Sequence, residues 1–290
     1  MMKNTVLITG ASRGIGLLTT KTLAKAGFQV FAAIRDTEER NAIVVKSLNE
    51  YAIENNVQIR IIEMDVTDEV SVNRAIEKVE QMSTIDVVIN NAGIMPVGLT
   101  EAFTIDDYKK CMDINVYGPA RTMRASLPFM RKRKSGLFIN ISSNAGRIAI
   151  PYFGIYCASK FALEAYTEAL HYEVEPFGIE AILIEPGGHG TDLVSNPPAP
   201  SDQKVLADYE YLTHGRDKIL GMFQGMFEQK DASTDAQNVA NKILELIEMK
   251  EQRPMRTTVG HNMGIDKINQ QSDIAQIGII SMLKPVYSGK

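Results

Sequence analysis

The chain has 290 residues, of which 23% are charged and 44% belong to the hydrophobic set, and its formal net charge is -4. This composition is that of a soluble globular protein of one large or two small domains, and it implies no nucleic acid partner. The two cysteines, Cys111 and Cys157, and the four histidines show no metal-ligand spacing, so we predict no metal site. No cysteine framework, signal peptide or apolar run of ~18 residues is evident, so we expect a cytoplasmic protein without a membrane span.

The first unit of the chain predicts an anion site. A short apolar strand over residues 4–9 leads into the glycine-rich turn 10–16, followed by a helix over 17–26 and a second strand over 29–34. Free N–H groups and the helix dipole favour an anion at a helix N-terminus, and glycines let the backbone approach it. The position of the glycines between a strand and a helix therefore predicts a pyrophosphate site.

The alternation of strands and helices continues along the chain. Helices are predicted over 38–54, 67–82 with Thr67 as N-cap, 106–133 with Asn115 inside it, and 155–176; strands are predicted over 57–63, 85–89, 137–141 and 179–185. This pattern predicts an α/β fold, a doubly wound parallel sheet with helices on both faces. Ligands bind beyond the carboxyl ends of such strands, where most of the polar clusters of this chain occur.

The alternation breaks between residues 188 and 231. Pro197, Pro198 and Pro200 exclude regular helix locally. An apolar set then recurs at helical spacing: Ile219, Met222, Phe223, Met226 and Phe227. This set fits a helix packed on the body of the protein, and it fits equally an apolar lid over a substrate.

The C-terminal part is harder to interpret. A last regular helix is predicted over 235–249 with Thr234 as its cap, and a final strand over 255–259. For residues 260–290 the sequence predicts only a variable C-terminal segment.

Tyr156 and Lys160 lie four residues apart on a predicted helix and therefore share a face. A phenol has an unperturbed pKa of about 10, and a neighbouring cation lowers the pKa of that phenol by favouring the phenolate. The pair is thus a candidate proton-transfer unit. The alternative is an ordinary solvated helix face, which is the commoner origin of an isolated Tyr-x-x-x-Lys pattern.

The motifs of this chain, in their order, resemble those of the classical short-chain dehydrogenases/reductases. They are Thr9-Gly10-x-x-x-Gly14-x-Gly16, Asn90-Asn91-Ala92-Gly93, Asn115, Ser143, Tyr156-x-x-x-Lys160, and Pro186-Gly187 with Thr191. The resemblance covers roughly residues 4–259 and implies a single Rossmann-fold domain over 1–290, with a substrate lid at 188–231. The segment around Tyr156 is most similar to 17β-hydroxysteroid and retinol dehydrogenases.

The resemblance implies a catalytic role for four residues. Tyr156 would transfer a proton to or from the substrate oxygen, and Lys160 would lower the tyrosine pKa and hold the nicotinamide ribose. Ser143 would hydrogen-bond the carbonyl or alcohol oxygen of the substrate. Asn115 would interrupt its helix and anchor a water that links Lys160 to solvent. Two hydroxyl donors suit a carbonyl that develops negative charge as it gains hydride.

The resemblance also implies a cofactor site. Its residues would be Gly10, Ser12, Arg13, Gly14, Ile15, Gly16, Arg35, Asp65, Asn91, Ala92, Gly93, Tyr156, Lys160 and Thr191. Within this set, Asp65 would contact the adenine and Thr191 the carboxamide. Asp65 could equally cap the following helix, Asn91-Ala92-Gly93 could be only a turn, and Ser143 could merely cap a strand end.

The residues after the second predicted strand favour NADP(H) over NAD(H). NAD-preferring relatives carry an acidic residue at the end of that strand, where this chain has Ile34 followed by Arg35. With Arg13 in the glycine turn, two guanidinium groups could grip a 2′-phosphate. We therefore predict NADP(H) as the cofactor.

The substrate is predicted to be an apolar alcohol or carbonyl compound. Apolar residues flank Ser143 and Tyr156 and recur in the predicted lid: Ile148, Ile150, Pro151, Tyr152, Phe153, Met222, Phe223, Met226 and Phe227. The resemblance also suggests a homodimer or homotetramer that packs through the helices at 106–133 and 155–176.

Two other functions fit the same fold. An epimerase or dehydratase of this fold usually carries a G-x-x-G-x-x-G turn and a longer substrate domain, and the sequence has neither. A non-catalytic cofactor sensor or scaffold typically lacks the tyrosine or the lysine, and here all four catalytic positions are intact. An NADP(H)-dependent oxidoreductase is therefore the leading hypothesis.

Overall fold

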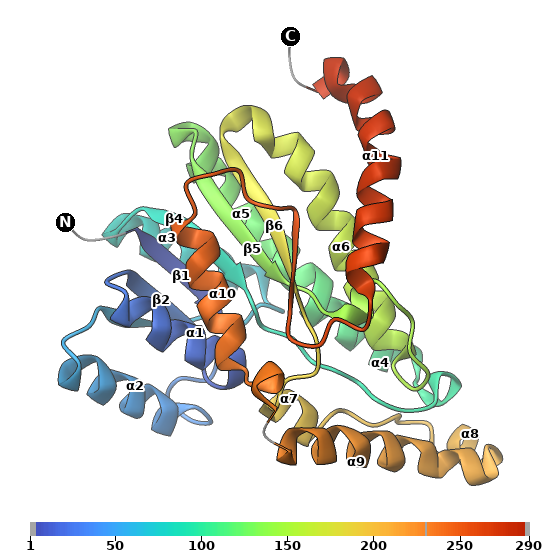
Figure 1. Ribbon diagram of the computed structural model, residues 1–290. Coiled ribbons are helices and arrows are strands. Elements are labelled where there is room, and N and C mark those ends of the chain that lie inside the picture. The colour runs from blue at the N-terminus through green and yellow to red at the C-terminus, as the bar shows by residue number, and fades with distance from the viewer. Residues whose placement is uncertain (1–3, 230, 288–290) are drawn as a thin grey trace.

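The computed structural model describes residues 4–229 and 231–287, and it contains a seven-stranded parallel sheet in the order β3-β2-β1-β4-β5-β6-β7. Figure 1 shows β1, β2, β4, β5 and β6 of this sheet. The strands are β1 Thr5–Thr9, β2 Gln29–Ile34, β3 Ile59–Glu63, β4 Ile85–Asn90, β5 Gly136–Ile141, β6 Ile179–Pro186 and β7 Arg256–Val259. Because β1 pairs with both β2 and β4, the direction of the crossovers reverses at β1. A ligand is expected beyond the carboxyl ends of these strands.

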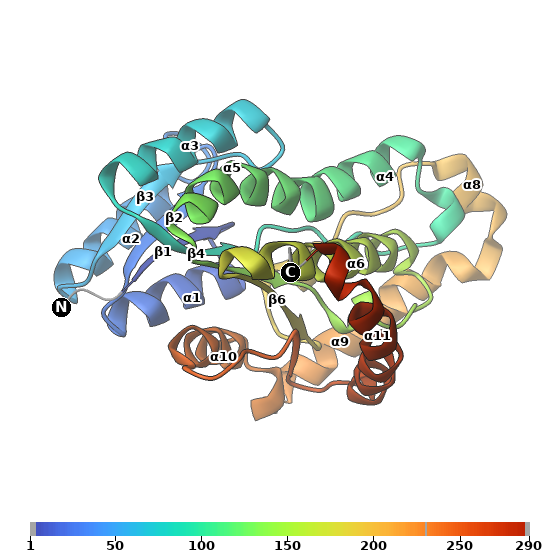
Figure 2. The same cartoon turned by 90° about the horizontal axis from the view of Figure 1, so that it is seen from above.

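Helices cover both faces of the sheet (Figure 2), which confirms the doubly wound α/β fold. One face carries α1 Gly14–Lys25, α2 Ala42–Glu54 and α10 Gln237–Glu248; the other carries α3 Glu69–Met82, α5 Gly118–Arg133 and α6 Gly154–Val174. Alternate strand residues supply the two cores. In β1, Val6 and Ile8 pack toward the first face and Leu7 toward the second, as the period of two in a strand requires.

The predicted helix over 106–133 is two α-helices. The first is α4 Ile105–Met112, the second is α5, and a π-helical turn over Asp113–Tyr117 joins them. The turn lies where the predicted functional residue Asn115 is found, and π-turns inside helices frequently occur at functional sites.

Two predicted helix caps are wrong. Asp68 caps α3 by accepting a hydrogen bond from the Val70 amide at 2.9 Å, whereas Thr67 donates its hydroxyl to Asp65. Helix α10 begins at Gln237, and Thr234 ends a short 3-10 turn in which its hydroxyl donates to the Asp231 carbonyl. In both places another Asp, Ser or Thr lies close by in the sequence. Residue type alone does not show which of these residues caps the helix.

The segment 188–231 contains short helices and irregular chain. Its helical elements are α7 Asp192–Ser195, α8 Gln203–Asp208, a 3-10 turn over Glu210–His214 and α9 Gly215–Glu228. The three prolines fall between α7 and α8, as predicted. The Val97 amide donates to the Pro198 carbonyl at 3.0 Å, and Arg216 Nε donates to the Val97 carbonyl at 2.9 Å. These bonds attach the segment to the chain that follows β4.

The sequence did not predict the last helix, α11 Ile265–Tyr287, which lies beside α6 (Figures 1 and 2). Its first turns are anchored by Ile265 and Asn269, which are both buried. Its later turns expose apolar side chains such as Ile274, Ile277 and Met282. In the described part of the chain, no helix has the length and apolar character to cross a membrane.

Candidate active site

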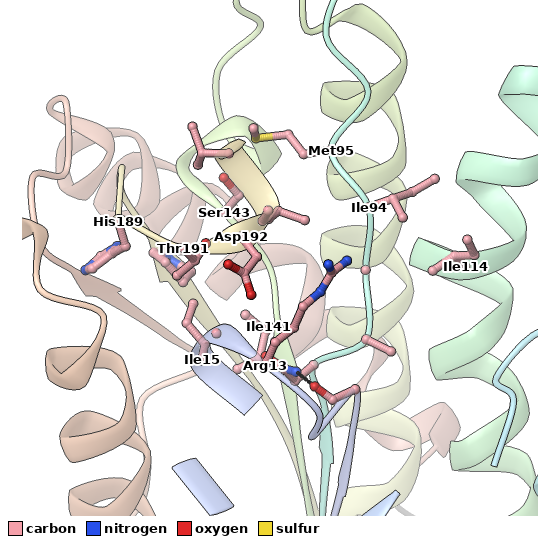
Figure 3. A pocket seen from close by; sticks show the side chains of 18 of the residues that line it. Arg13, Ile15, Ile94, Met95, Ile114, Ile141, Ser143, His189, Thr191 and Asp192 are labelled. Atoms are coloured by element: carbon pink, nitrogen blue, oxygen red, sulfur yellow. Dashed lines mark hydrogen bonds between the residues drawn. The ribbon is translucent and has the colours of Figure 1, made fainter. Parts of the chain in front are cut away.

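A cavity of about 320 Å³ lies at the carboxyl ends of the strands (Figure 3). Of the predicted cofactor residues, all except Gly16 line it. Of the predicted catalytic residues, Ser143, Tyr156 and Lys160 line it and Asn115 does not. Elements that are distant in sequence thus bring the two predicted groups to one cavity.

The glycine turn has the backbone that a close ligand approach needs. Gly10 and Gly14 have φ values of 65° and 52°, a left-handed conformation that favours glycine. A Cβ at Gly16 would lie 2.3 Å from the Gly10 carbonyl oxygen, so Gly16 serves the packing of the turn. Asn91 Nδ2 donates to the carbonyls of Thr9 and Gly10 at 2.9 and 3.1 Å, which ties the end of β4 to this turn.

Three arginines are among the residues that line the cavity. Arg13 is the N-cap residue of α1, and its side chain reaches into the cavity in the view of Figure 3. Arg35 directly follows β2 and also lines the cavity. Arg40, which the sequence analysis did not single out, lines it as well, beside Asn41, whose Nδ2 donates to the Arg35 carbonyl at 2.7 Å. Guanidinium groups are suited to holding an anionic group.

Asp65 lines the same part of the cavity. Its Oδ1 accepts hydrogen bonds from the Thr67 amide at 2.9 Å and the Thr67 hydroxyl at 2.7 Å. The carboxylate thus closes the turn after β3 rather than capping α3. Across the cavity, the side chain of Thr191 would lie 3.5 Å from a Cβ at Gly14, so the loop after β6 passes over the glycine turn.

Tyr156 lies in the first turn of α6, and it is only 5% exposed. Burial raises the pKa of Tyr156 to about 12, and the neighbouring Ser143 hydroxyl opposes this rise. The expectation of a lowered tyrosine pKa is therefore wrong for this structure, because the loss of solvent outweighs any stabilisation of the phenolate. A phenol with a raised pKa stays protonated at neutral pH, which is the state that donates a proton.

Lys160 is buried one helical turn after Tyr156. Its Nζ lies 5.7 Å from the centre of the Tyr156 ring and donates a hydrogen bond to the Ile141 carbonyl at 2.8 Å. Burial lowers the pKa of Lys160 to about 8, while Cys111 and Glu164 act in the opposite direction. The ammonium is thus held at the end of β5, beside the tyrosine.

Asn115 lies in the π-helical turn and is almost fully buried. Its Nδ2 donates to the Ile94 carbonyl and to the Ser159 hydroxyl, both at 2.9 Å, and its Oδ1 accepts from the Ile94 amide at 2.9 Å. Asn115 therefore joins the chain after β4 to helix α6. Its side chain braces the site from behind the cavity wall.

The opposite end of the cavity is apolar. Ile150, Phe153, Phe223 and Phe227 line it as predicted, and Phe153 meets Phe223 edge to face with ring centres 5.9 Å apart. Other predicted wall residues do not line it: Ile148, Pro151, Tyr152, Met222 and Met226. Met95, Leu193, Val194 and Met263 also line the cavity, and the sequence analysis did not single them out. Met222 fails because it lies on the solvent side of α9, 74% exposed.

Comparison with known proteins identifies the family. The model of the short chain dehydrogenase family matches residues 4–201. The chain belongs to the short-chain dehydrogenase/reductase family. The resemblance deduced from the motifs is thereby confirmed, and the chain is a member of an oxidoreductase family.

Two relatives and one solved structure show the extent of the similarity. The chain is 38% identical over 197 residues to a 3-ketodihydrosphingosine reductase of Bacteroides thetaiotaomicron, covering 68% of each chain. It is 34% identical over 227 residues to 17-beta-hydroxysteroid dehydrogenase type 1 of Homo sapiens, covering 74% of this chain and 68% of that one. A gluconate 5-dehydrogenase from Burkholderia cenocepacia in complex with NADP and tartrate matches with a TM-score of 0.66 and 25% identity, covering 83% of this chain and 87% of that chain.

Proposed function

We propose that this protein is an NADP(H)-dependent oxidoreductase that interconverts an apolar secondary alcohol and its ketone, or an aldehyde and its alcohol. The observation that carries the proposal is one cavity with Ser143, Tyr156 and Lys160 near its middle. Three arginines line one end of this cavity and apolar side chains line the other.

The fit of the cofactor rests on the shape and charge of the site. The positive φ values of Gly10 and Gly14 let the backbone approach a pyrophosphate at the N-terminus of α1. Arg13 and Arg35, with Arg40 beside them, would hold a 2′-phosphate, and no acidic side chain occupies the end of β2, where Ile34 stands. The NADP complex of the gluconate 5-dehydrogenase supports the same choice.

The residues of the chain would handle the proton. When bound, NADPH supplies the hydride, and the substrate oxygen then develops negative charge. Tyr156 donates its proton to that oxygen, and the Ser143 hydroxyl donates a hydrogen bond to it. Lys160 places a cation beside the phenol and, with Thr191, would hold the nicotinamide end of the cofactor. Asn115 keeps α6 and the chain after β4 in register through its three hydrogen bonds.

The apolar wall supports an apolar substrate. Its side chains surround the space beyond Tyr156 and come from the chain after β4, from the start of α6 and from α7 and α9. The two relatives are named for a ketone of a sphingoid chain and for a hydroxysteroid, which agrees with this choice. Segment 188–231 is accordingly the substrate lid of a single domain.

We further propose a cytoplasmic homodimer or homotetramer. Along α6 the exposed face is apolar and free of charge at Ala158, Phe161, Ala165 and Ala169. Such a face permits a close approach of a second copy of the helix. The two cysteines are unpaired and buried, in keeping with a reducing compartment.

The test is the variant Tyr156→Phe. It removes the hydroxyl that donates the proton and keeps the ring that packs in the cavity. We expect turnover with NADPH and a ketone to fall by about 10³-fold, while the dissociation constant for NADPH changes less than about threefold. Turnover close to that of the native protein would overturn the proposed mechanism, and loss of NADPH binding would show that the variant damaged the site itself.

A further inference from the structure

Met263 lies in a short loop over residues 260–264 that joins β7 to α11, and it lines the cavity. It is 55% exposed, whereas Tyr156, which lines the same cavity, is 5% exposed. The cavity therefore extends from a buried phenol to a methionine that borders solvent. A single exposed apolar side chain is common on protein surfaces, so the backbone and the attachments of the loop decide whether Met263 has a function.

The backbone of Met263 has a conformation that methionine rarely adopts. Its φ is 51°, in the left-handed region, and the glycines at the two ends of the loop, Gly260 and Gly264, have φ values of 80° and 82°. Glycine adopts such angles without steric strain, whereas a residue with a Cβ is destabilised by them. Strained residues of this kind occur mostly at active sites and where a ligand is held. For folding alone a glycine would suit position 263 better, which points to a use for the methionine side chain.

The first half of the loop is attached beside the catalytic residues. The His261 carbonyl accepts a hydrogen bond from Asn144 Nδ2 at 2.8 Å, and Asn144 directly follows Ser143. A Cβ at Gly187 would lie 2.2 Å from the His261 carbonyl oxygen, so the loop also packs closely on the chain that leaves β6. These contacts hold the loop next to the strand end that presents Ser143.

The second half of the loop is held by the start of α11. The Asn262 side chain accepts a hydrogen bond from the Gly264 amide at 2.9 Å, and the Asn262 carbonyl accepts one from the Ile265 amide at 2.9 Å. Ile265 is fully buried, and one turn later Asn269 donates to Glu185 of β6 at 2.6 Å. Both ends of the loop are therefore anchored to the body of the protein, which fixes the place of the residue between them.

Methionine suits a wall that contacts a flexible apolar ligand. Its side chain is unbranched, turns about several single bonds and carries a polarizable sulfur, so it adapts to irregular apolar surfaces. A second methionine, Met95, lines the cavity from the chain after β4 and is buried. A substrate whose reacting carbonyl lies at the buried Tyr156 and whose remainder leads toward solvent would meet the exposed border of the cavity at Met263.

We propose that Met263 is a specificity-determining residue for the proposed reaction: its side chain contacts the apolar chain of the substrate and favours long-chain carbonyl compounds over short ones. This inference rests on the proposed function of the site and narrows its substrate class to ketones or aldehydes with a long, flexible apolar chain. It assigns to the loop, and to α11 as its anchor, the role of a wall of the substrate site.

The test is the chain-length dependence of ketone reduction with NADPH by M263A and by a matched control, M282A. The substrates are straight-chain methyl ketones of increasing length, beginning with butanone. We expect M263A to lose about 10-fold in kcat/KM for the longest ketone and less than about twofold for butanone. Met282 is a methionine of α11 that is 70% exposed and does not line the cavity, so M282A should keep the chain-length dependence of the native protein.

Two other variants separate the contact from the stability of the fold. M263G also removes the side chain but accepts the left-handed backbone, so it should unfold at a higher temperature than M263A and show the same loss for long ketones. M263L keeps an apolar side chain of similar volume and should restore kcat/KM for the longest ketone to within about threefold of the native value. A defect caused by a weakened fold would instead follow the melting temperature and be milder in M263G.

The outcomes distinguish this inference from the proposed function. Absence of any Tyr156-dependent carbonyl reduction by the native protein would defeat the proposed function. A native enzyme that reduces carbonyls without a preference for longer chains, or a preference that persists in M263A, would leave the proposed reaction standing and overturn the role of Met263. An equal loss for butanone and for the longest ketone, or weaker NADPH binding by M263A, would overturn it as well.

Discussion

The two ends of the cavity are built in different ways. At the cofactor end, backbone groups and short polar side chains of the strand ends hold one another, as Asn91 holds the carbonyls of Thr9 and Gly10. At the substrate end, the wall consists of apolar side chains from several segments that are far apart in the sequence. Met95, Phe153, Phe223 and Met263 come from four of them.

The cofactor end and the substrate end of the cavity are determined by different parts of the sequence. A strand, a glycine turn and a helix form the first end locally, and Asn91 ties the end of β4 to that turn. The second end depends on how the lid and the C-terminal segment fold over the body. We therefore expect cofactor binding to depend on the charge of the side chains at the cofactor end, and substrate binding to depend on the volume of those at the substrate end. A substitution at one end should have little effect on binding at the other.

Among the substitutions that distinguish the two ends of the cavity, we expect Arg35→Asp to have the largest effect on binding. Loss of one guanidinium group and gain of a carboxylate next to a 2′-phosphate should weaken NADPH binding about 10- to 100-fold, and NADH binding by less than about threefold. Fluorescence titration with both cofactors measures this. Arg74→Asp, an exposed residue of α3 outside the cavity, is the matched control. Equal losses for NADPH and NADH would refute the assignment of the arginine end.

A smaller effect is expected at the substrate end. Phe223→Ala removes a ring that lines the cavity and contacts Phe153, so we expect KM for a bulky apolar ketone to rise about 10-fold while NADPH affinity is unchanged. Met222→Ala is the control, because Met222 is next to Phe223 on α9 and is 74% exposed. A similar rise in KM for both variants would mean that α9 acts through its stability and not through its contact with the substrate.

A further effect concerns stability and the buried ammonium of Lys160. The pKa of Lys160 falls from 10.5 to about 8 on folding, so between these pH values the unfolded chain holds a proton that the folded chain has released. Stability therefore rises with pH across this window. Lys160→Met should be about 1 to 3 kcal/mol more stable than the native protein at pH 7, and this difference should shrink as pH approaches 10.5. Urea denaturation at several pH values measures it, and a constant difference would contradict the explanation.

The sequence predicted the local features of the site well. The glycine turn, the strand ends and the Tyr156–Lys160 pair depend on short-range spacing, and the structure brings them to one cavity. The lowered tyrosine pKa was wrong because the degree of burial, which here raises it, depends on the whole fold. The interruption of the helix at Asn115, which the resemblance implied, is confirmed as a π-helical turn, although the apolar pattern alone does not show it.

Features made by distant residues could not be predicted. Arg256 meets Glu164 and Glu168 across about ninety residues of chain, and neither partner has a local signature. Met263, which lies just before α11 and has a left-handed backbone conformation, also lines the cavity. Helix α11 was not predicted either, and its later apolar side chains face solvent.

The most direct measurement is the initial rate of NADPH and NADH oxidation across ketones and aldehydes of increasing chain length and ring size. We predict turnover that is much faster with NADPH than with NADH and that improves with apolar bulk, because one end of the cavity is cationic and the other is apolar. Tight NADPH binding without turnover of any carbonyl, or a preference for small polar sugars, would contradict the proposed function.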